Sequence, residues 1–324
     1  MKTAEEFNRY YDVNLISKLR DLENERKKLL RPMIFLCLPF VGSVVIFFLN
    51  FFVLHFHHLD RALFVGAILI NGTLGAVFLP RFFKLKKTLK VKYKEEIIKE
   101  MVYFIDPSLS YNSTSFISQS DFENSKLFTK GIDRYEGDDL VVGNIGKTEV
   151  RFSELNAQYE TTDKDGRSRY VSIFNGIFFI ADFHKDFVGE TIVLPDTAEK
   201  LFGKLGAMFQ KMNISRPDLV KLENPDFEKA FVVYGTDQVE TRYILTPALI
   251  QRIMDFQKKS GKIYLSFLYS KVYIAISLNK NLFEPPLFKS MLNYKLVEDY
   301  FKYLILMVNI VEDLDLNTRI WSKN

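Results

Sequence analysis

MIFLCLPFVGSVVIFFLNFFVL, at residues 33–54, is followed after a short loop by ALFVGAILINGTLGAVFL, at residues 62–79, and neither run contains Asp, Glu, Lys or Arg. As helices rising 1.5 Å per residue, the runs would cover about 33 and about 27 Å, lengths that bracket the hydrocarbon thickness of a bilayer. Apolar side chains cover every face of the first run, whereas a core helix of a globular domain normally carries a polar stripe. The sequence therefore predicts a two-helix transmembrane hairpin over residues 33–80, with a pair of buried core helices as the alternative.

Basic residues flank the two outer ends of this hairpin but not the loop between its helices. The loop between the runs, residues 55–61, offers a single Arg against one Asp. The two outer flanks are strongly basic: Arg20, Arg26, Lys27, Lys28 and Arg31 precede the first run, and Arg81, Lys84, Lys86, Lys87, Lys90, Lys92 and Lys94 follow the second. Because Lys and Arg beside a span resist translocation, we expect both termini to be cytoplasmic and only a short turn to lie outside.

The basic helical neck, residues 81–108, is a candidate lipid-binding segment. Lys84, Lys86, Lys87 and Lys90 could contact anionic headgroups, or they could serve only to set the topology. The net charge of the whole chain is only +4, and the basic cluster lies against the predicted membrane. We therefore expect the lipid bilayer, and no nucleic acid, as the partner of this segment.

The rest of the chain has the composition of a folded protein. Residues 1–32 are predicted to form a cytoplasmic amphipathic helix, in which Leu15, Leu19, Leu22 and Leu29 make a short apolar stripe. Residues 109–324 have room for a cytoplasmic α+β domain with a substantial core. Cys37, the only cysteine, lies inside the first apolar run, so the chain can form no intrachain disulfide.

Within residues 109–324 the apolar period alternates between that of strands and that of helices. Strands with turns between them are predicted at residues 140–142, 149–159, 169–183 and 191–194, with a bulge near Ser153 and Glu154 where the alternation changes phase. A helix is expected at 197–212, strands at 230–234 and 240–245, and a helix at 247–259 opened by Thr246 and Pro247. A hairpin at 262–268 and 271–278 and a helix at 290–314 complete an α+β fold built on antiparallel sheet.

Two segments of this region align without gaps. Residues 141–153 and 232–244 share two valines, and Glu149, Arg151 and Phe152 match Glu240, Arg242 and Tyr243. Related halves at about 109–215 and 216–324 are one explanation, and chance similarity between strand sequences is the other.

No established catalytic or metal-binding motif occurs in the chain. Residues 142–148, VGNIGKT, superficially resemble a phosphate-binding loop, but Val141 stands where the first glycine is required. The following residues, 149–152, alternate like a strand and do not open a helix that could hold phosphate. We therefore expect no nucleotide, cofactor or metal site.

Four clusters of polar residues have both a chemical and a structural explanation. His55, His57 and His58 with Asp60 could bind a metal or lie at the membrane interface, and Asp182 could orient His184 as a general base or belong to a polar turn. Charged residues beside strands and helix ends are usually solvated or paired locally, which favours structural roles for the remaining clusters. These are Asp237, Glu240 and Arg242, and Glu312, Asp313, Asp315 and Arg319.

Several ordered motifs resemble a known bacterial membrane-protein family. They are FNGIFFIADF at 174–183, VLPD at 193–196, VKLENPDFE at 220–228, DQVETRYILTP at 237–247 and LNTRIW at 316–321. Together they resemble the domain of unknown function 3137, and the similarity is predicted to extend from the N-terminal helix to the C-terminus. The family has no established activity, so the resemblance implies a bacterial membrane protein and assigns no catalytic residue. With both termini cytoplasmic, we expect this protein in the inner membrane.

These observations predict a multi-pass membrane protein that acts as a binding or scaffold module and presents its α+β domain to the cytoplasm. We expect a protein or lipid partner, or a homo-oligomer formed through the hairpin. The alternative is an enzyme acting on a membrane-associated substrate, which would need a pocket that gathers the acids listed above.

Overall fold

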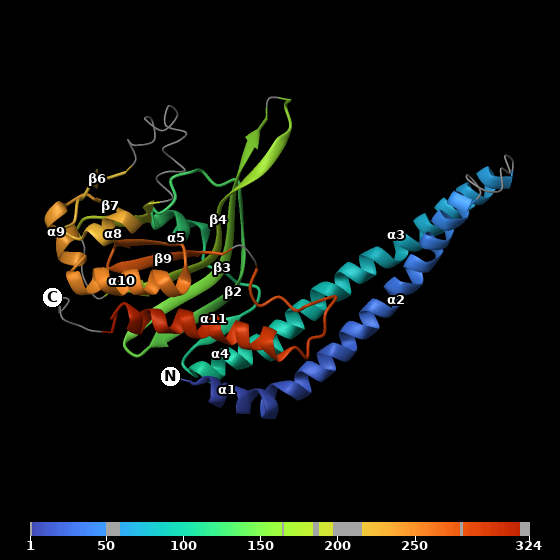
Figure 1. The fold of residues 1–324 in the computed structure, drawn as a ribbon, viewed down its shortest axis with the longest axis horizontal. Helices are drawn as coiled ribbons and strands as arrows, with labels where there is room; N and C mark the ends of the chain where they lie inside the picture. The colour runs from blue at the N-terminus through green and yellow to red at the C-terminus, as the bar shows by residue number, and fades with distance from the viewer. Residues whose placement is uncertain are drawn as a thin grey trace. The chain divides into compact units, whose positions relative to one another are not determined.

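The computed structural model describes residues 2–49, 59–163, 165–183, 188–196, 216–278 and 281–317 (Figure 1). In the two long helices, only the backbone is described at residues 33–40, 46–47, 49, 59–65, 67–68, 70–71 and 74–75. The chain divides into a helical unit, Met1–Ile98 with Glu284–Tyr294, and a sheet unit, Lys99–Phe283 with Lys295–Asn324.

The helical unit contains two long helices that contact each other. Its elements are α1 (Ala4–Tyr10), a π-helical turn η1 (Tyr11–Leu15), α2 (Ile16–Leu49), α3 (Leu59–Tyr93) and a π-helical turn η3 (Lys94–Ile98). The first helix begins at Ala4, within the segment predicted to form an amphipathic helix. A capping box fixes this start: the Thr3 hydroxyl accepts the Glu6 N–H at 3.2 Å and the Glu6 carboxylate accepts the Thr3 N–H at 2.7 Å. The leucine stripe of the N-terminal helix is buried, as predicted.

Among the residues that the structure describes, no helix is both long enough and apolar enough to span a bilayer. Most side chains of the two predicted spans, residues 33–54 and 62–79, lie outside the described part of the chain.

In the described part of the sheet unit, nine antiparallel strands form one sheet in the order β1-β2-β3-β4-β9-β8-β5-β7-β6. The α+β class and the antiparallel sheet are therefore confirmed. The strands are β1 (Ser110–Asn112), β2 (Arg134–Ile145), β3 (Thr148–Thr162), β4 (Ser168–Asp182), β5 (Thr191–Pro195), β6 (Asp218–Leu219), β7 (Phe231–Gly235), β8 (Ile263–Leu268) and β9 (Lys271–Ser277).

Helices cover both faces of this sheet (Figure 1). They are α4 (Lys99–Ile105), α5 (Gln119–Asn124), α8 (Pro225–Ala230), α9 (Gln238–Ile244), α10 (Pro247–Ser260) and α11 (Tyr294–Asp313). On one face, Phe122 of α5 packs with Phe174 and Phe178 of β4 in the main aromatic cluster. On the other face, over which Figure 1 draws α10 and α11, Phe152 stacks on Phe179 at 5.9 Å. Burial of both faces explains why every residue of β5 and β8 is buried.

The predicted strand at residues 240–245 is wrong, because these residues belong to α9 and the turn that follows it. The Asp237 carboxylate accepts the N–H groups of Val239 at 2.7 Å and Glu240 at 3.0 Å. This N-cap satisfies two of the free donors at the helix start and overrides the strand-like alternation of the side chains. The segments proposed as a repeat consequently differ: residues 148–153 lie in a strand, whereas residues 238–244 form a helix.

The predicted irregularity near Ser153 is real, but the extra residue lies on the partner strand. Asp138 pairs with Glu154 and Val141 with Phe152, so two residues of β2, Asp139 and Leu140, face Ser153 alone. Asp139 adopts a φ of 61°, which turns its side chain out of the normal alternation. The helix predicted at 197–212 lies outside the described residues.

Other predicted boundaries agree closely with the structure. Helix α10 begins at Pro247 with the Thr246 hydroxyl accepting the Leu249 N–H at 3.2 Å, and it ends before Gly261. Helix α4 ends at Ile105, directly before Asp106 and Pro107. Helix α11 begins only at Tyr294, four residues later than predicted, because residues 284–294 belong to the helical unit.

Candidate functional site

A short segment held by charged groups is the most distinctive polar feature of the helical unit. We call residues 284–294 the strap. The Arg26 guanidinium donates to both Glu23 carboxylate oxygens, at 2.9 and 2.7 Å, and also to the Leu287 carbonyl at 2.7 Å. Glu23 in turn accepts the Met291 N–H at 3.0 Å. A buried ion pair on α2 therefore fixes two backbone groups of the strap.

The two ends of the strap are fixed by further contacts within the same unit. The Glu284 carboxylate lies 2.6 Å from the Lys90 ammonium and 3.3 Å from that of Lys94, which is fully buried. At the other end, the Tyr294 ring packs edge-on against Tyr11 with centroids 5.0 Å apart. The strap thus contacts both α2 and α3, and covalent bonds join it to the sheet unit at Phe283 and Lys295.

The ion pair at the centre of the strap shifts the pKa of both its members. The hydrogen bonds from Arg26, followed by the Met291 N–H, lower the pKa of Glu23 from 4.5 to about 2. Glu23 raises the pKa of Arg26 in return. The side chains are only 4% and 9% exposed, so water screens this pair weakly. The pair is therefore charged across the physiological pH range and holds the strap as a charge-assisted clamp.

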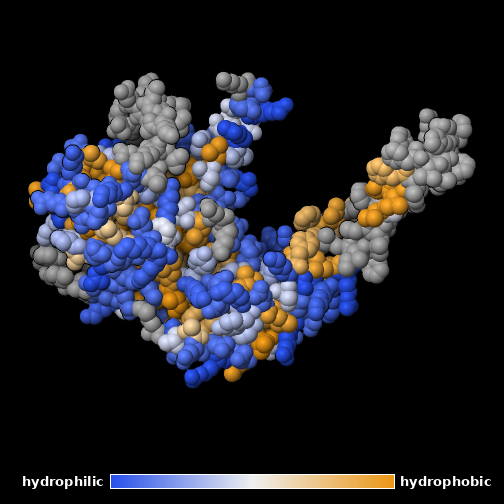
Figure 2. All heavy atoms as spheres, viewed as in Figure 1, coloured by the Kyte–Doolittle hydropathy of each residue, from blue (hydrophilic) through white to orange (hydrophobic). Residues whose placement is uncertain are grey.

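The predicted lipid-binding lysines divide into two groups. Lys84, Lys86 and Lys87 are exposed on α3, whereas Lys90 is partly buried against Glu284 of the strap. Close to these lysines, both long helices expose large apolar side chains, and Figure 2 shows them as orange patches on α2 and α3. The exposed residues are Val41, Val44, Val45 and Phe48 on α2, and Leu69, Val77, Leu79, Phe83 and Leu85 on α3.

Three carboxylates come together at the bulge of β2. Asp138, Asp139 and Glu154 each place an oxygen within 4.8 Å of the others. Oxygen ligands of this kind suit hard divalent cations such as Mg²⁺ or Ca²⁺. However, the Tyr111 hydroxyl donates to Asp139, and Glu154 accepts the Leu282 N–H at 2.9 Å. Two of the carboxylates therefore already have structural partners that account for their burial.

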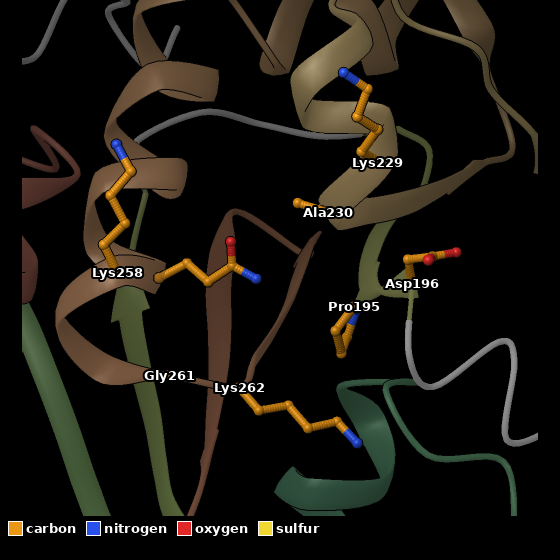
Figure 3. Close-up of a pocket in the computed structure, with 8 residues that line it drawn as sticks. Pro195, Asp196, Lys229, Ala230, Lys258, Gly261 and Lys262 are labelled. Carbon is orange, nitrogen blue, oxygen red and sulfur yellow. The ribbon is translucent and has the colours of Figure 1, made fainter.

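A pocket of about 420 Å³ opens beside the ends of α8 and α10 (Figure 3). Lys229, Lys258 and Lys262 line it, but Figure 3 shows that their ammonium groups lie apart and do not converge. Lys229 and Lys258 lie in the last turns of their helices, where they oppose the partial negative charge of the helix ends and pair with Asp226 and Asp255. The pocket therefore lacks converging groups that could act on a substrate.

The structure does not gather the predicted acidic clusters into a catalytic site. The Glu240 carboxylate accepts the N–H groups of Val188 and Gly189, at 3.0 and 2.7 Å. Asp237 caps α9, and Arg242 donates to the Lys221 carbonyl at 3.3 Å. Each member of this cluster therefore has a structural partner.

The other candidates are dispersed or lie outside the described residues. Asp313 pairs with Lys259 at 2.8 Å and Asp315 with Arg252 at 3.4 Å, while Glu312 is exposed and its backbone carbonyl accepts from Arg252. Asp182 ends β4. His184 and Arg319 lie outside the described residues, as do His55, His57 and His58 and the side chain of Asp60.

Residues 142–148 form a hairpin between β2 and β3, as their alternation predicted. Gly146 has a φ of 62°, and Asn317 accepts the Lys147 N–H at 3.0 Å beside it. This turn bonds to Asn317 and leads into β3, which confirms the strand predicted at residues 149–152.

Residues 172–316 match the family model described as "Protein of unknown function (DUF3137)". The match confirms the resemblance to the domain of unknown function 3137 over that range, which begins in β4 and includes the strap. No curated protein and no solved structure matches the chain. The sequence motifs missed the strap, although Arg26, which interrupts the leucine stripe of α2, was a signal of its anchor.

Proposed function

We propose that this chain, with its DUF3137 match over residues 172–316, is a membrane-anchored binding module in the bacterial inner membrane. In this proposal, the apolar parts of α2 and α3 cross the bilayer as a hairpin. The termini and the sheet unit lie on the cytoplasmic side, where the sheet unit binds a protein or lipid partner.

The observation that carries the proposal is the exposure of large apolar side chains on both long helices. Val45 and Phe48 of α2 and Leu69 and Val77 of α3 are about half exposed or more. Water disfavours such a contiguous apolar surface, whereas lipid solvates it favourably. On insertion scales each Leu, Ile, Val or Phe at the centre of a span favours the membrane by about 0.3–0.6 kcal/mol, so the two runs together carry a strong preference.

The charges on the helices support the orientation. The exposed lysines of α3 begin five residues after the second apolar run, and Arg26 and Arg31 precede the first run. Basic residues are favoured on the cytoplasmic side of a span, and both flanks of this hairpin are basic. The bacterial inner membrane is taken from the family resemblance.

Binding is favoured over catalysis by the state of the polar groups in the sheet unit. Four of the acids singled out from the sequence cap a helix, bond to backbone or form surface ion pairs: Asp237, Glu240, Asp313 and Asp315. Both faces of the central strands are covered, and the lysines of the pocket diverge. A partner would therefore be recognised through the outer surface of the sheet unit.

An extraction experiment tests the anchor. Membranes containing the full-length chain are washed with alkaline carbonate, and the retained fraction is compared between the natural chain and a Val45→Arg, Leu69→Arg double variant. We expect the natural chain to stay with the membranes and the variant to be released, because an Arg at the centre of a span costs about 3 kcal/mol or more.

Val13→Arg is the matched control, since Val13 is also exposed but lies far from the apolar run. This variant should remain membrane-bound. Complete release of the natural chain by carbonate would overturn the anchor.

For the binding role, a photo-crosslinker at exposed Tyr243 or Tyr170 should give specific, saturable adducts in native membranes. If no exposed position of the sheet unit gives an adduct, the binding role is wrong.

A further inference from the structure

The strap exposes an aromatic residue at its turn. Phe288 is 75% exposed, and its neighbours Lys289 and Ser290 are also exposed. The backbone on either side is fixed, because the Leu287 carbonyl accepts from Arg26 and the Met291 N–H donates to Glu23. Phe288 is therefore held outward by a rigid support and is not simply part of a loosely attached loop.

The contacts of the strap define how far each of its residues lies from the apolar runs. Glu284 bonds at the level of Lys90, about 16 Å along α3 from Leu79, and Leu287 bonds at the level of Arg26, about 10 Å along α2 from Met33. Met291 returns to the level of Glu23, at about 15 Å. Residues 287–289 thus form the apex of the strap, the part nearest to the apolar runs.

This level matches the boundary between hydrocarbon and water. The headgroup layer adds about 5–8 Å on each side of the hydrocarbon core, and an aromatic side chain extends several Å beyond its backbone. Amphipathic and aromatic side chains are enriched at this depth. If the hairpin is inserted, the Phe288 ring reaches the headgroup layer.

The charges at the same level suit anionic lipid. Lys84 and Lys87 lie about 8 and about 12 Å along α3 from Leu79, and Lys289 follows Phe288 directly. The carboxylates of α2 at this level, Glu23 and Glu25, are engaged by Arg26 and Lys92. Positive charge therefore predominates around an exposed aromatic ring.

We infer that the strap apex, Phe288 and Lys289, together with Lys84, Lys86 and Lys87, forms a surface that binds the headgroups of anionic phospholipids. This inference rests on the proposed membrane anchor and adds a contact that the hairpin alone does not require. Because the strap joins β9 to α11, a short stretch of chain connects this lipid-binding surface to the sheet unit.

The test is a tryptophan scan in reconstituted full-length protein. In a Trp321→Phe background, which removes the only natural tryptophan, Phe288→Trp is compared with Val13→Trp. Val13 is 76% exposed in the same unit but lies about 27 Å along the helix from Arg31. Vesicles are made of phosphatidylcholine with or without phosphatidylglycerol, and brominated acyl chains serve as the quencher.

We expect Phe288→Trp to be quenched and blue-shifted, more strongly with phosphatidylglycerol, while Val13→Trp is unaffected. Adding Lys289→Gln should raise the phosphatidylglycerol content needed for half-maximal quenching about fivefold. Flotation of the vesicles distinguishes the lipid contact of the strap from the membrane anchor. If the protein floats with the vesicles but Phe288→Trp is quenched no more than Val13→Trp, the lipid contact is wrong and the anchor stands. If the protein does not float, both are wrong.

Discussion

Replacing Glu23 by Gln tests the strap clamp most sharply. The carboxylate is 4% exposed and accepts two hydrogen bonds from Arg26 and one from the Met291 N–H. Glu23→Gln keeps the shape of the side chain but leaves the Arg26 charge without its counter-ion in a buried position. Removing one partner of a buried ion pair costs about 3–5 kcal/mol.

The pKa of Glu23 gives a similar magnitude by a separate route. A pKa of about 2 in the folded chain, against 4.5, corresponds to about 3 kcal/mol of stabilisation at neutral pH. Because the pKa of Glu23 is lowered by folding, this contribution is complete above about pH 4.5 and is lost as the pH falls towards 2. Acidification over that range should therefore mimic the variant.

The assay is hydrogen exchange of strap amides in detergent-solubilised full-length protein. We expect Glu23→Gln to accelerate exchange of the Met291 amide roughly a hundredfold, the factor that about 3 kcal/mol implies. Glu25→Gln is the matched control, because Glu25 is 43% exposed and its pair with Lys92 should contribute less than about 1 kcal/mol. Equal exchange in the two variants would refute the clamp.

Three further predictions concern the sheet unit and the pair itself. Asp237→Ala removes the α9 cap and should lower the free energy of unfolding by about 1 kcal/mol in urea titration. The control, Asp226→Ala, breaks an exposed ion pair and should change that free energy by less than about 0.5 kcal/mol. Equal losses would contradict the cap. Gly176→Ala should lower the free energy of unfolding by about 2 kcal/mol or more, since φ is 150° and a Cβ would lie 2.1 Å from the Ile276 carbonyl oxygen. The Cβ of Gly131→Ala would meet nothing within 4 Å, so this control should leave the free energy unchanged in the same titration. Glu23→Leu combined with Arg26→Met should recover part of the stability that Glu23→Gln loses, measured by thermal unfolding. No buried charge is left unpaired, although the Leu287 carbonyl and the Met291 N–H lose their side-chain partners. A double variant less stable than Glu23→Gln would contradict that reasoning.

Sequence predicted those elements of the fold whose conformation depends on residues close together in the chain. Strands β3 and β4, helix α10 and the end of α4 were predictable, because alternation, a Thr-Pro start and an Asp-Pro stop are local signals. Helix α9 was mistaken for a strand, since Val239, Thr241 and Tyr243 alternate with polar residues. The side chain of Asp237, bonded to two backbone N–H groups, caps that segment as a helix.

The strap could not be predicted, because its conformation depends on residues more than 250 positions away in sequence. Pro285 and Pro286 mark it as irregular, and nothing local indicates that Glu23 and Arg26 hold it. Arg26 interrupts the leucine stripe, and its role became visible only when Leu287 and Glu23 were found around its guanidinium.

Labelling of single cysteines tests the membrane hairpin most directly. In a Cys37→Ser background, His57→Cys, Val13→Cys and Val239→Cys are treated with a membrane-impermeant maleimide in intact cells and again after permeabilisation. The account predicts that His57→Cys reacts in intact cells, whereas Val13→Cys and Val239→Cys react only after permeabilisation. Labelling of Val13→Cys or Val239→Cys in intact cells, or protection of His57→Cys there, would contradict it.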